Sequence, residues 1–227
     1  MQPQDAPTAF LFKLWPWIEA NKNRVIAGTV IIIIAIFLYS YFSWQREQNE
    51  IAAGTAYTQL TASIPSSAGV EQLAGGYLKI AGEYPGTPGG RRAWLQGAAA
   101  LFDAGRFADA QEQFQKFLDA SPDSDFSASA ALGVAASLES LGKLDLAISA
   151  YQRVSSGFSD VVAANAAKFA LARIDERQGK FNDALNFYES IARAVPGSVL
   201  AQEASMRGME IRTKSVSATP AAVKPGL

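Results

Sequence analysis

The chain has 227 residues, 20 basic and 21 acidic side chains, no cysteine and no histidine. The missing cysteine excludes disulfides and thiolate-ligated metals, and the missing histidine excludes serine–histidine–aspartate catalysis and histidine-ligated metals. A net charge of −1 gives no attraction to nucleic acid, and 49% hydrophobic against 18% charged residues indicates a membrane segment joined to a soluble part.

The first predicted element is a membrane-spanning helix over residues 25–45. No residue between Arg24 and Arg46 is charged. A helix of this length rises about 31 Å, which matches the hydrocarbon core of a bilayer. The bulky stretch Tyr41-Phe42-Ser43-Trp44 closes the segment, where a cleaved signal peptide would have small residues. The sequence therefore favours an uncleaved anchor that contacts the lipid bilayer.

The basic residues beside this helix predict its orientation. Lys13, Lys22 and Arg24 precede the helix, whereas only Arg46 follows it closely. Basic residues are retained on the cytoplasmic side of a membrane. We therefore expect residues 1–24 to form a short cytoplasmic segment, with the large C-terminal part across the membrane.

A repeat of 37 residues follows the anchor. Three copies begin at Gly105, Gly142 and Gly179 and align without a gap. Their shared pattern is glycine, a basic residue, a large apolar residue, two variable residues, alanine, three variable residues and an aromatic. Three residues after each aromatic stands another apolar side chain, at Phe117, Val154 and Ile191. A degenerate copy precedes Pro85, with Tyr77 and Ile80 at the matching positions.

Each shared position predicts a structural role. The glycine allows a tight turn between two antiparallel helices, and the alanine is small where the two helices of a pair press together. The aromatic falls on the same helical face as the alanine and fills the space between pairs. Such helix pairs stack into a solenoid because one pair cannot bury its apolar face alone.

The ends and loops of the soluble part follow from composition. We expect the solenoid to occupy residues 46–213 and to end on a capping helix, Val199 to Arg212. Residues 214–227, rich in proline, alanine and serine, are predicted to be disordered. Residues 85–90, with two prolines and three glycines, are predicted to form a loop.

The repeat resembles the tetratricopeptide repeat over roughly residues 70–212. The glycine, alanine and aromatic positions, the trailing Pro122 and Pro196 and the paired helices match, although the usual period is about 34 residues. The resemblance implies an all-α fold, in which a single N-terminal transmembrane helix is followed by a tetratricopeptide-like solenoid of helical hairpins with period 37.

No group of residues predicts catalysis. Asp123 and Asp125 are interpreted as acidic loop residues, and Gly89-Gly90 lacks the strand-to-helix context of a phosphate-binding loop. We therefore expect a protein that is not an enzyme, with no cofactor, no metal site, no nucleic-acid partner and no small-molecule substrate.

The resemblance implies a binding groove lined by the first helix of each pair. Carried over one by one, the groove positions are Arg92, Leu95, Phe102, Leu132, Glu139, Phe169, Arg173, Glu176 and Arg177. The longer period leaves a second interpretation open, in which Leu95, Leu132 and Phe169 belong to the core. The mixed charges do not indicate a clamp for a terminal carboxylate.

The whole arrangement is similar to the bacterial ancillary translocon subunit family, the YfgM-like proteins. The similarity rests on the basic, aromatic stretch 14–24 before the anchor, on the anchor itself and on the exit Trp44-Gln45. It implies a single-pass protein of the inner membrane with its C-terminal domain in the periplasm. It also implies a chaperone-like role beside the Sec translocon, with that complex and a periplasmic chaperone as partners.

A second interpretation is a structural scaffold of another envelope complex. The regular period of 37 and links such as Pro122-Asp123-Ser124 are also similar to tetratricopeptide proteins of the Tol-Pal coordinator and outer-membrane assembly type. Those proteins are secreted or lipidated, whereas this chain has no cysteine for a lipid.

Overall fold

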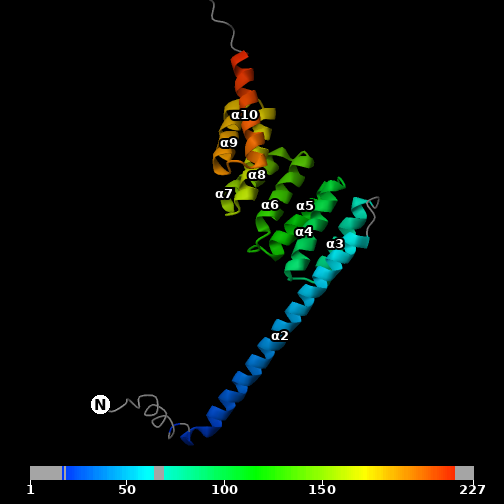
Figure 1. Ribbon diagram of the computed structural model, residues 1–227, viewed down its shortest axis with the longest axis vertical. Helices are drawn as coiled ribbons and strands as arrows, with labels where there is room; N and C mark the ends of the chain where they lie inside the picture. The colour runs from blue at the N-terminus through cyan, green and yellow to red at the C-terminus, as the bar shows by residue number, and fades with distance from the viewer. Residues whose placement is uncertain (1–16, 18, 64–68, 218–227) are drawn as a thin grey trace, which may run out of the picture. The chain divides into compact units, whose positions relative to one another are not determined.

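The computed structural model describes residues 17, 19–63 and 69–217, and all regular structure within them is helical (Figure 1). The chain divides into two compact units, residues 1–52 and 53–227, which are described separately. The helices are α2 (Lys22–Ser63), α3 (Val70–Glu83), α4 (Pro88–Asp103), α5 (Phe107–Ala120), α6 (Ser127–Ser140), α7 (Leu144–Gly157), α8 (Val161–Arg177), α9 (Phe181–Ala194) and α10 (Val199–Ser217).

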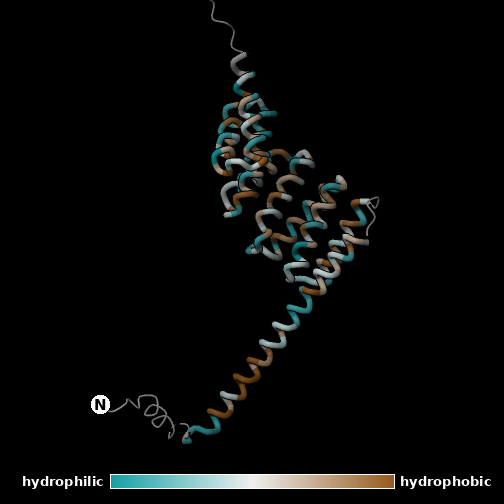
Figure 2. The backbone as a smooth tube through the Cα atoms, viewed as in Figure 1, coloured by the Kyte–Doolittle hydropathy of each residue, from teal (hydrophilic) through white to brown (hydrophobic). Residues whose placement is uncertain are grey.

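The first unit is dominated by the apolar part of α2. Figure 2 shows a hydrophobic run along this helix, and side chains such as Ile31, Phe37 and Tyr39 are exposed. The hydroxyl of Thr29 is satisfied within the helix, since its Oγ1 donates to the Val25 carbonyl at 2.9 Å. Within the described residues, α2 is the one helix long and apolar enough to cross a membrane.

The second unit begins with the last turns of α2, which pair with α3. Tyr57 of α2 packs on Tyr77 of α3 with ring centroids 5.3 Å apart, and Ile80 is buried. The degenerate copy of the repeat therefore forms a helix pair, as its aromatic and apolar positions predict. Three full pairs follow, α4–α5, α6–α7 and α8–α9, and α10 packs on α9.

The three repeat glycines form the turns within the full pairs. Gly105, Gly142 and Gly179 have φ angles of +77°, +73° and +75°, which lie in the left-handed region. A side chain is strained there, so these positions require glycine, as the sequence predicts.

The repeat alanines and aromatics form the core between the helices. Ala110, Ala147 and Ala184 are fully buried, and Phe117, Val154 and Ile191 are at most 1% exposed. The aromatics Phe114, Tyr151 and Tyr188 are buried as well. The helical-hairpin solenoid with period 37 is thus confirmed.

Enlarging a core alanine should overpack the contact between the two helices of a pair. Replacing Ala147, which is 0% exposed, with leucine is expected to lower the free energy of unfolding by about 1–3 kcal/mol. Replacing the exposed Ser149 of the same helix with alanine should change it by less than about 0.5 kcal/mol. Urea unfolding of the two variants measures the difference, and equal stabilities would contradict this assignment of faces.

Two helix ends differ from the expected ones. Helix α4 begins at Pro88, inside the expected loop 85–90, because Thr87 caps it by accepting the Gly90 amide proton and proline suits the first turn. Helix α10 continues to Ser217, so residues 214–217 are helical rather than disordered. An ion pair of 2.8 Å between Lys214 and Glu210 supports this last turn. The rest of the expected tail lies outside the described residues.

Candidate functional site

The first helices of neighbouring pairs contact one another, α4 with α6 and α6 with α8. The candidate groove residues all come from these three helices. Because the pairs are offset by 37 residues, Phe102, Glu139 and Glu176 occupy equivalent positions near the C-terminal ends of α4, α6 and α8. This row is where the candidate residues interact most closely.

Glu139 is the centre of an interaction network across three helices. Its carboxylate accepts hydrogen bonds from Arg173 at 3.0 and 3.1 Å, from Arg177 at 2.6 Å and from the Tyr151 hydroxyl at 2.9 Å. The Glu139 side chain is 13% exposed, whereas Arg173 and Arg177 are 50% and 56% exposed. One largely buried carboxylate therefore binds two arginines, and the remaining N–H donors of these arginines face solvent.

The same tyrosine–carboxylate contact recurs one repeat later. The Tyr188 hydroxyl donates to Glu176 at 3.1 Å. In the first full pair the equivalent position holds Phe102, whose ring packs on Phe107 with centroids 5.1 Å apart. The row thus changes from apolar in the first pair to charged in the second and third.

The remaining candidate residues lie partly apart from this network. Arg92 is exposed near the start of α4. Leu95, Leu132 and Phe169 are partly buried and pack against the core, and the ring of Phe169 lies 5.5 Å from that of Tyr188. These three side chains are partly exposed, as the groove interpretation expects. They also contact the core, as the second interpretation expects.

Sequence reasoning missed Tyr151 and Tyr188 as partners of the glutamates. The repeat contained a signal for these contacts. Glutamate takes the position of Phe102 in both later pairs, and tyrosine takes the position of Phe114. A joint change from two aromatics to a carboxylate and a phenol indicates that the two positions touch.

The two phenols are held in their neutral form. Burial, followed by the negative charge of Glu176, raises the pKa of Tyr188 to about 12. Burial, followed by the charge of Glu139, raises the pKa of Tyr151 as well. An ionised phenol would be poorly solvated and would repel its own acceptor.

These shifts predict a loss of stability in alkali. Tyrosine in an unfolded chain titrates near about pH 10, so above that pH the folded protein binds more protons than the unfolded chain. The free energy of unfolding should stay level below about pH 9 and fall between about pH 10 and 12, by at most roughly 1.4 kcal/mol per pH unit for each phenol. Replacing Tyr188 with phenylalanine should flatten this slope in urea unfolding, whereas an unchanged slope would contradict the shift.

The arrangement exposes two guanidinium groups around one carboxylate. No set of three or more carboxylates in the described part of the chain could hold a metal ion. Asp123 and Asp125 line a shallow loop pocket, and the neighbouring Asp160 caps α8 by accepting the amide protons of Val162 and Ala163.

The stacked helix pairs form an all-helical repeat solenoid. Proteins of this class typically serve as non-enzymatic scaffolds for protein–protein interaction. The chain belongs to the tetratricopeptide repeat-like domain family, whose model matches residues 16–156, including the apolar part of α2. A tetratricopeptide repeat model also matches residues 137–199.

Some solved structures are similar to the chain at low sequence identity. No curated protein matches the chain. Among solved structures, it is similar to nearly identical TPR-like repeats of a putative kinesin light chain from Podosopora anserina, with 12% identity, coverage of 78% of this chain and 99% of that one, and a TM-score of 0.49. It is also similar to BtubC (BKLC) from P. vanneervenii, with 13% identity, coverage of 80% and 96%, and a TM-score of 0.46.

Proposed function

We propose that this protein is a membrane-anchored module that binds other proteins through the interaction network of Glu139, Arg173 and Arg177. The exposed arginines carry this proposal, because each keeps guanidinium donors free of Glu139 and within reach of a partner. Their exposed guanidinium donors suit an acidic or carbonyl-rich segment. Leu132 and Phe169 would add apolar contact beside them.

The proposed location is the inner membrane, with residues 25–45 in the bilayer, the N-terminus in the cytoplasm and the repeats in the periplasm. The excess of basic residues ahead of the apolar helix supports this orientation. Anchoring raises the concentration of the repeats beside a membrane partner, on the order of millimolar, so weak contacts suffice.

The proposed partner is the Sec translocon, with a chaperone-like role for proteins that enter the periplasm. The resemblance of the region before the anchor, of the anchor and of Trp44-Gln45 to the ancillary translocon subunits supports this choice. A periplasmic chaperone acting on the same clients is the second expected partner.

Co-purification from membranes after mild detergent extraction tests the proposal. We expect translocon subunits to be retained by the wild-type protein and reduced at least fivefold by Arg173→Glu with Arg177→Glu. The matched control is Lys143→Glu with Arg153→Glu, which makes the same change of charge on the exposed residue before α7 and on an exposed residue within it, and should retain the partners.

Two outcomes would redirect the proposal. Retention of a different envelope complex, with no translocon, would favour the scaffold interpretation. The second outcome is full retention of the translocon by the Arg173→Glu, Arg177→Glu variant, with an unchanged thermal midpoint. This result would show that the network of Glu139, Arg173 and Arg177 is not the binding surface.

A further inference from the structure

Helix α10 occupies the place of the first helix of a fourth pair. The offset of 37 residues from α8 aligns Met206 with Phe169 and Met209 with Ala172. The residues equivalent to Met209 are 0% exposed in all three full pairs, namely Ala98, Ala135 and Ala172. Met209 itself is 58% exposed, and Met206 is 59% exposed. A position that is buried in every full pair is therefore open at this end of the array.

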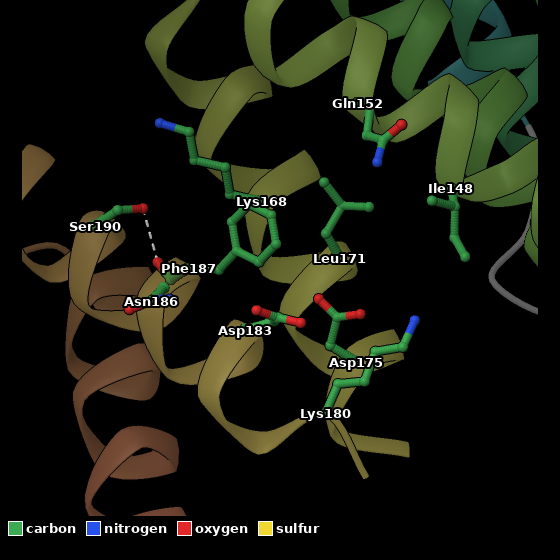
Figure 3. A pocket seen from close by; sticks show the side chains of 10 residues that line it. All are labelled: Ile148, Gln152, Lys168, Leu171, Asp175, Lys180, Asp183, Asn186, Phe187 and Ser190. Atoms are coloured by element: carbon green, nitrogen blue, oxygen red, sulfur yellow. Dashed lines mark hydrogen bonds between the residues drawn. The ribbon is translucent and has the colours of Figure 1, made fainter. Parts of the chain in front are cut away.

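The cover that Met209 lacks is the second helix of a pair. In the third pair, Ala172 is buried in one cluster with residues of α9 such as Tyr188. Figure 3 shows the neighbouring position, where the ring of Phe187 of α9 lies beside Leu171 of α8. Among the described residues no helix follows α10. The open face of α10 is thus a seat for a helix.

The chain does not turn back after α10 as it does after the other first helices. Helices α4, α6 and α8 each end two residues before a turn glycine. The equivalent position in the fourth unit is Val216, which lies within α10, and the helix continues to Ser217. Next in the sequence come Pro220 and Pro225, whereas α5, α7 and α9 are uninterrupted helices of 14 residues. The residues that follow α10 therefore do not match a second helix.

The open face of α10 has the same pattern of residues in both directions. Gln202, Met206, Met209 and Thr213 are exposed and follow one another at spacings of four, three and four residues. These spacings place them in one stripe along the helix, with the two methionines in the middle. A second copy of α10 that runs antiparallel would set each Met206 against Met209 of the other copy, around a two-fold axis.

The charges beside this stripe also match an antiparallel copy. One flank carries charges of alternating sign, at Glu203, Arg207, Glu210 and Lys214. Read in reverse, the same order places Glu203 beside Lys214 of the second copy, and Arg207 beside its Glu210. A parallel copy would place each charge beside the like charge. Within one helix Glu210 pairs with Lys214 at 2.8 Å and with Arg207 at 3.7 Å, which keeps the flank balanced.

We infer that α10 binds α10 of a second copy of this chain in antiparallel orientation, with Met206 and Met209 at the centre of the contact. Methionine side chains are flexible and pack well against one another. A helix of 19 residues is about 28 Å long, so the contact is small and weak in free solution. Copies anchored in one bilayer meet at a high effective concentration, so a weak contact suffices. The inference rests on the proposed anchoring and adds a surface for self-association.

Disulfide cross-linking of the full chain in its own membranes tests the inference. The chain has no cysteine, so single cysteines can be introduced at Gln202 and Thr213. Co-expressed Gln202→Cys and Thr213→Cys chains with different tags should form a linked dimer that carries both tags. Either variant expressed alone should give at least tenfold less dimer. In an antiparallel pair the two Gln202 positions are separated by about 17 Å along the helices, which a disulfide cannot span.

Glutamate substitutions assign the contact to the methionines. Adding Met206→Glu with Met209→Glu to both tagged chains should lower cross-linking at least tenfold. The matched control, Leu146→Glu with Val162→Glu, makes the same kind of change at exposed apolar residues outside α10 and should leave cross-linking unchanged. Because all four side chains are more than half exposed, we expect both variants to keep the thermal midpoint of the wild type.

A charge exchange tests the orientation independently. Glu203→Lys alone should lower cross-linking about threefold, because it faces Lys214 of the second copy. Adding Lys214→Glu exchanges the two charges and should restore cross-linking to the level of the wild-type flank.

Three results would overturn the inference. The first is equal cross-linking in the mixed and the single expressions, which indicates a parallel pair or random collision. The second is unchanged cross-linking in the Met206→Glu, Met209→Glu variant. The third is a product in which the cysteines of α10 link to a different protein and no mixed dimer forms, which would identify a foreign helix as the occupant.

The outcome is distinguishable from failure of the proposed function. Arg173→Glu with Arg177→Glu changes another part of the array and should leave cross-linking unchanged. Recovery of the tagged chains with the membrane fraction checks the anchoring separately, before any cross-link is scored.

Discussion

Replacing Ile32, Ile33 and Ile34 together with lysine is expected to abolish membrane insertion, and with it the activity of a periplasm-active phosphatase fused after Leu227. Each lysine at the centre of a spanning helix opposes insertion by about 2.5–3.5 kcal/mol, so three exceed the gain from the remaining apolar residues. The wild-type fusion should be active and recovered with the membranes, because the proposed orientation exports the repeats.

The matched control replaces the same three residues with leucine, which keeps the helix apolar and should keep the fusion active. An active fusion in the lysine variant would show that α2 does not anchor the protein. A wild-type fusion active only when its reporter works in the cytoplasm would reverse the proposed orientation and remove the support for a translocon partner.

Replacing Phe117 with alanine is expected to lower the free energy of unfolding of the solenoid by about 3–5 kcal/mol. Phe117 is 0% exposed, and its ring meets Trp94 edge-on with centroids 5.7 Å apart. Removing the ring leaves a cavity between α4 and α5 that rigid helices cannot close. Urea unfolding followed by far-ultraviolet circular dichroism in detergent measures the loss.

Phe181→Ala is the control for that experiment. Phe181 stands at the start of α9 and is 49% exposed, so its removal should cost less than about 1.5 kcal/mol. A similar loss for both phenylalanines would mean that the burial of Phe117 does not determine the stability of the first full pair.

The core of the solenoid could be predicted because each of its constraints is local or periodic. Gly142 can be assigned from a turn that needs a positive φ, and Ala147 from a helix contact that admits no larger side chain. Their recurrence at 37 residues sets the stacking, since equal spacing places equal residues at equal positions in successive pairs. The sequence alone therefore predicts the turns and core contacts of the full pairs.

The contacts of the groove could not be predicted in the same way. Arg173 and Arg177 reach Glu139 from the next pair, and long side chains can reach several acceptors from one backbone position. The predicted loop 85–90 is correct for residues 85–87, but α4 already begins at Pro88. Gly90 lies in the first turn of α4, where an added Cβ would collide with the Tyr84 carbonyl, and this close approach is not visible in the sequence.

The environment of Asp175 could not be predicted from the repeat alone. The sequence alone places it in line with Leu101 and Leu138, yet whether such a substitution exposes the residue or opens a cavity depends on the neighbouring helices. Only the structure places Asp183 and Phe187 beside it.

The contacts of Glu139 also make the two junctions of the array unequal in their response to the medium. Between the second and third pairs the first helices, α6 and α8, are bridged by half-exposed charges, which dissolved ions screen. In the first full pair the equivalent position holds the uncharged Phe102, which packs on Phe107 of the same pair. Added salt should therefore weaken the contact between the second and third pairs more than the contact between the first and second pairs.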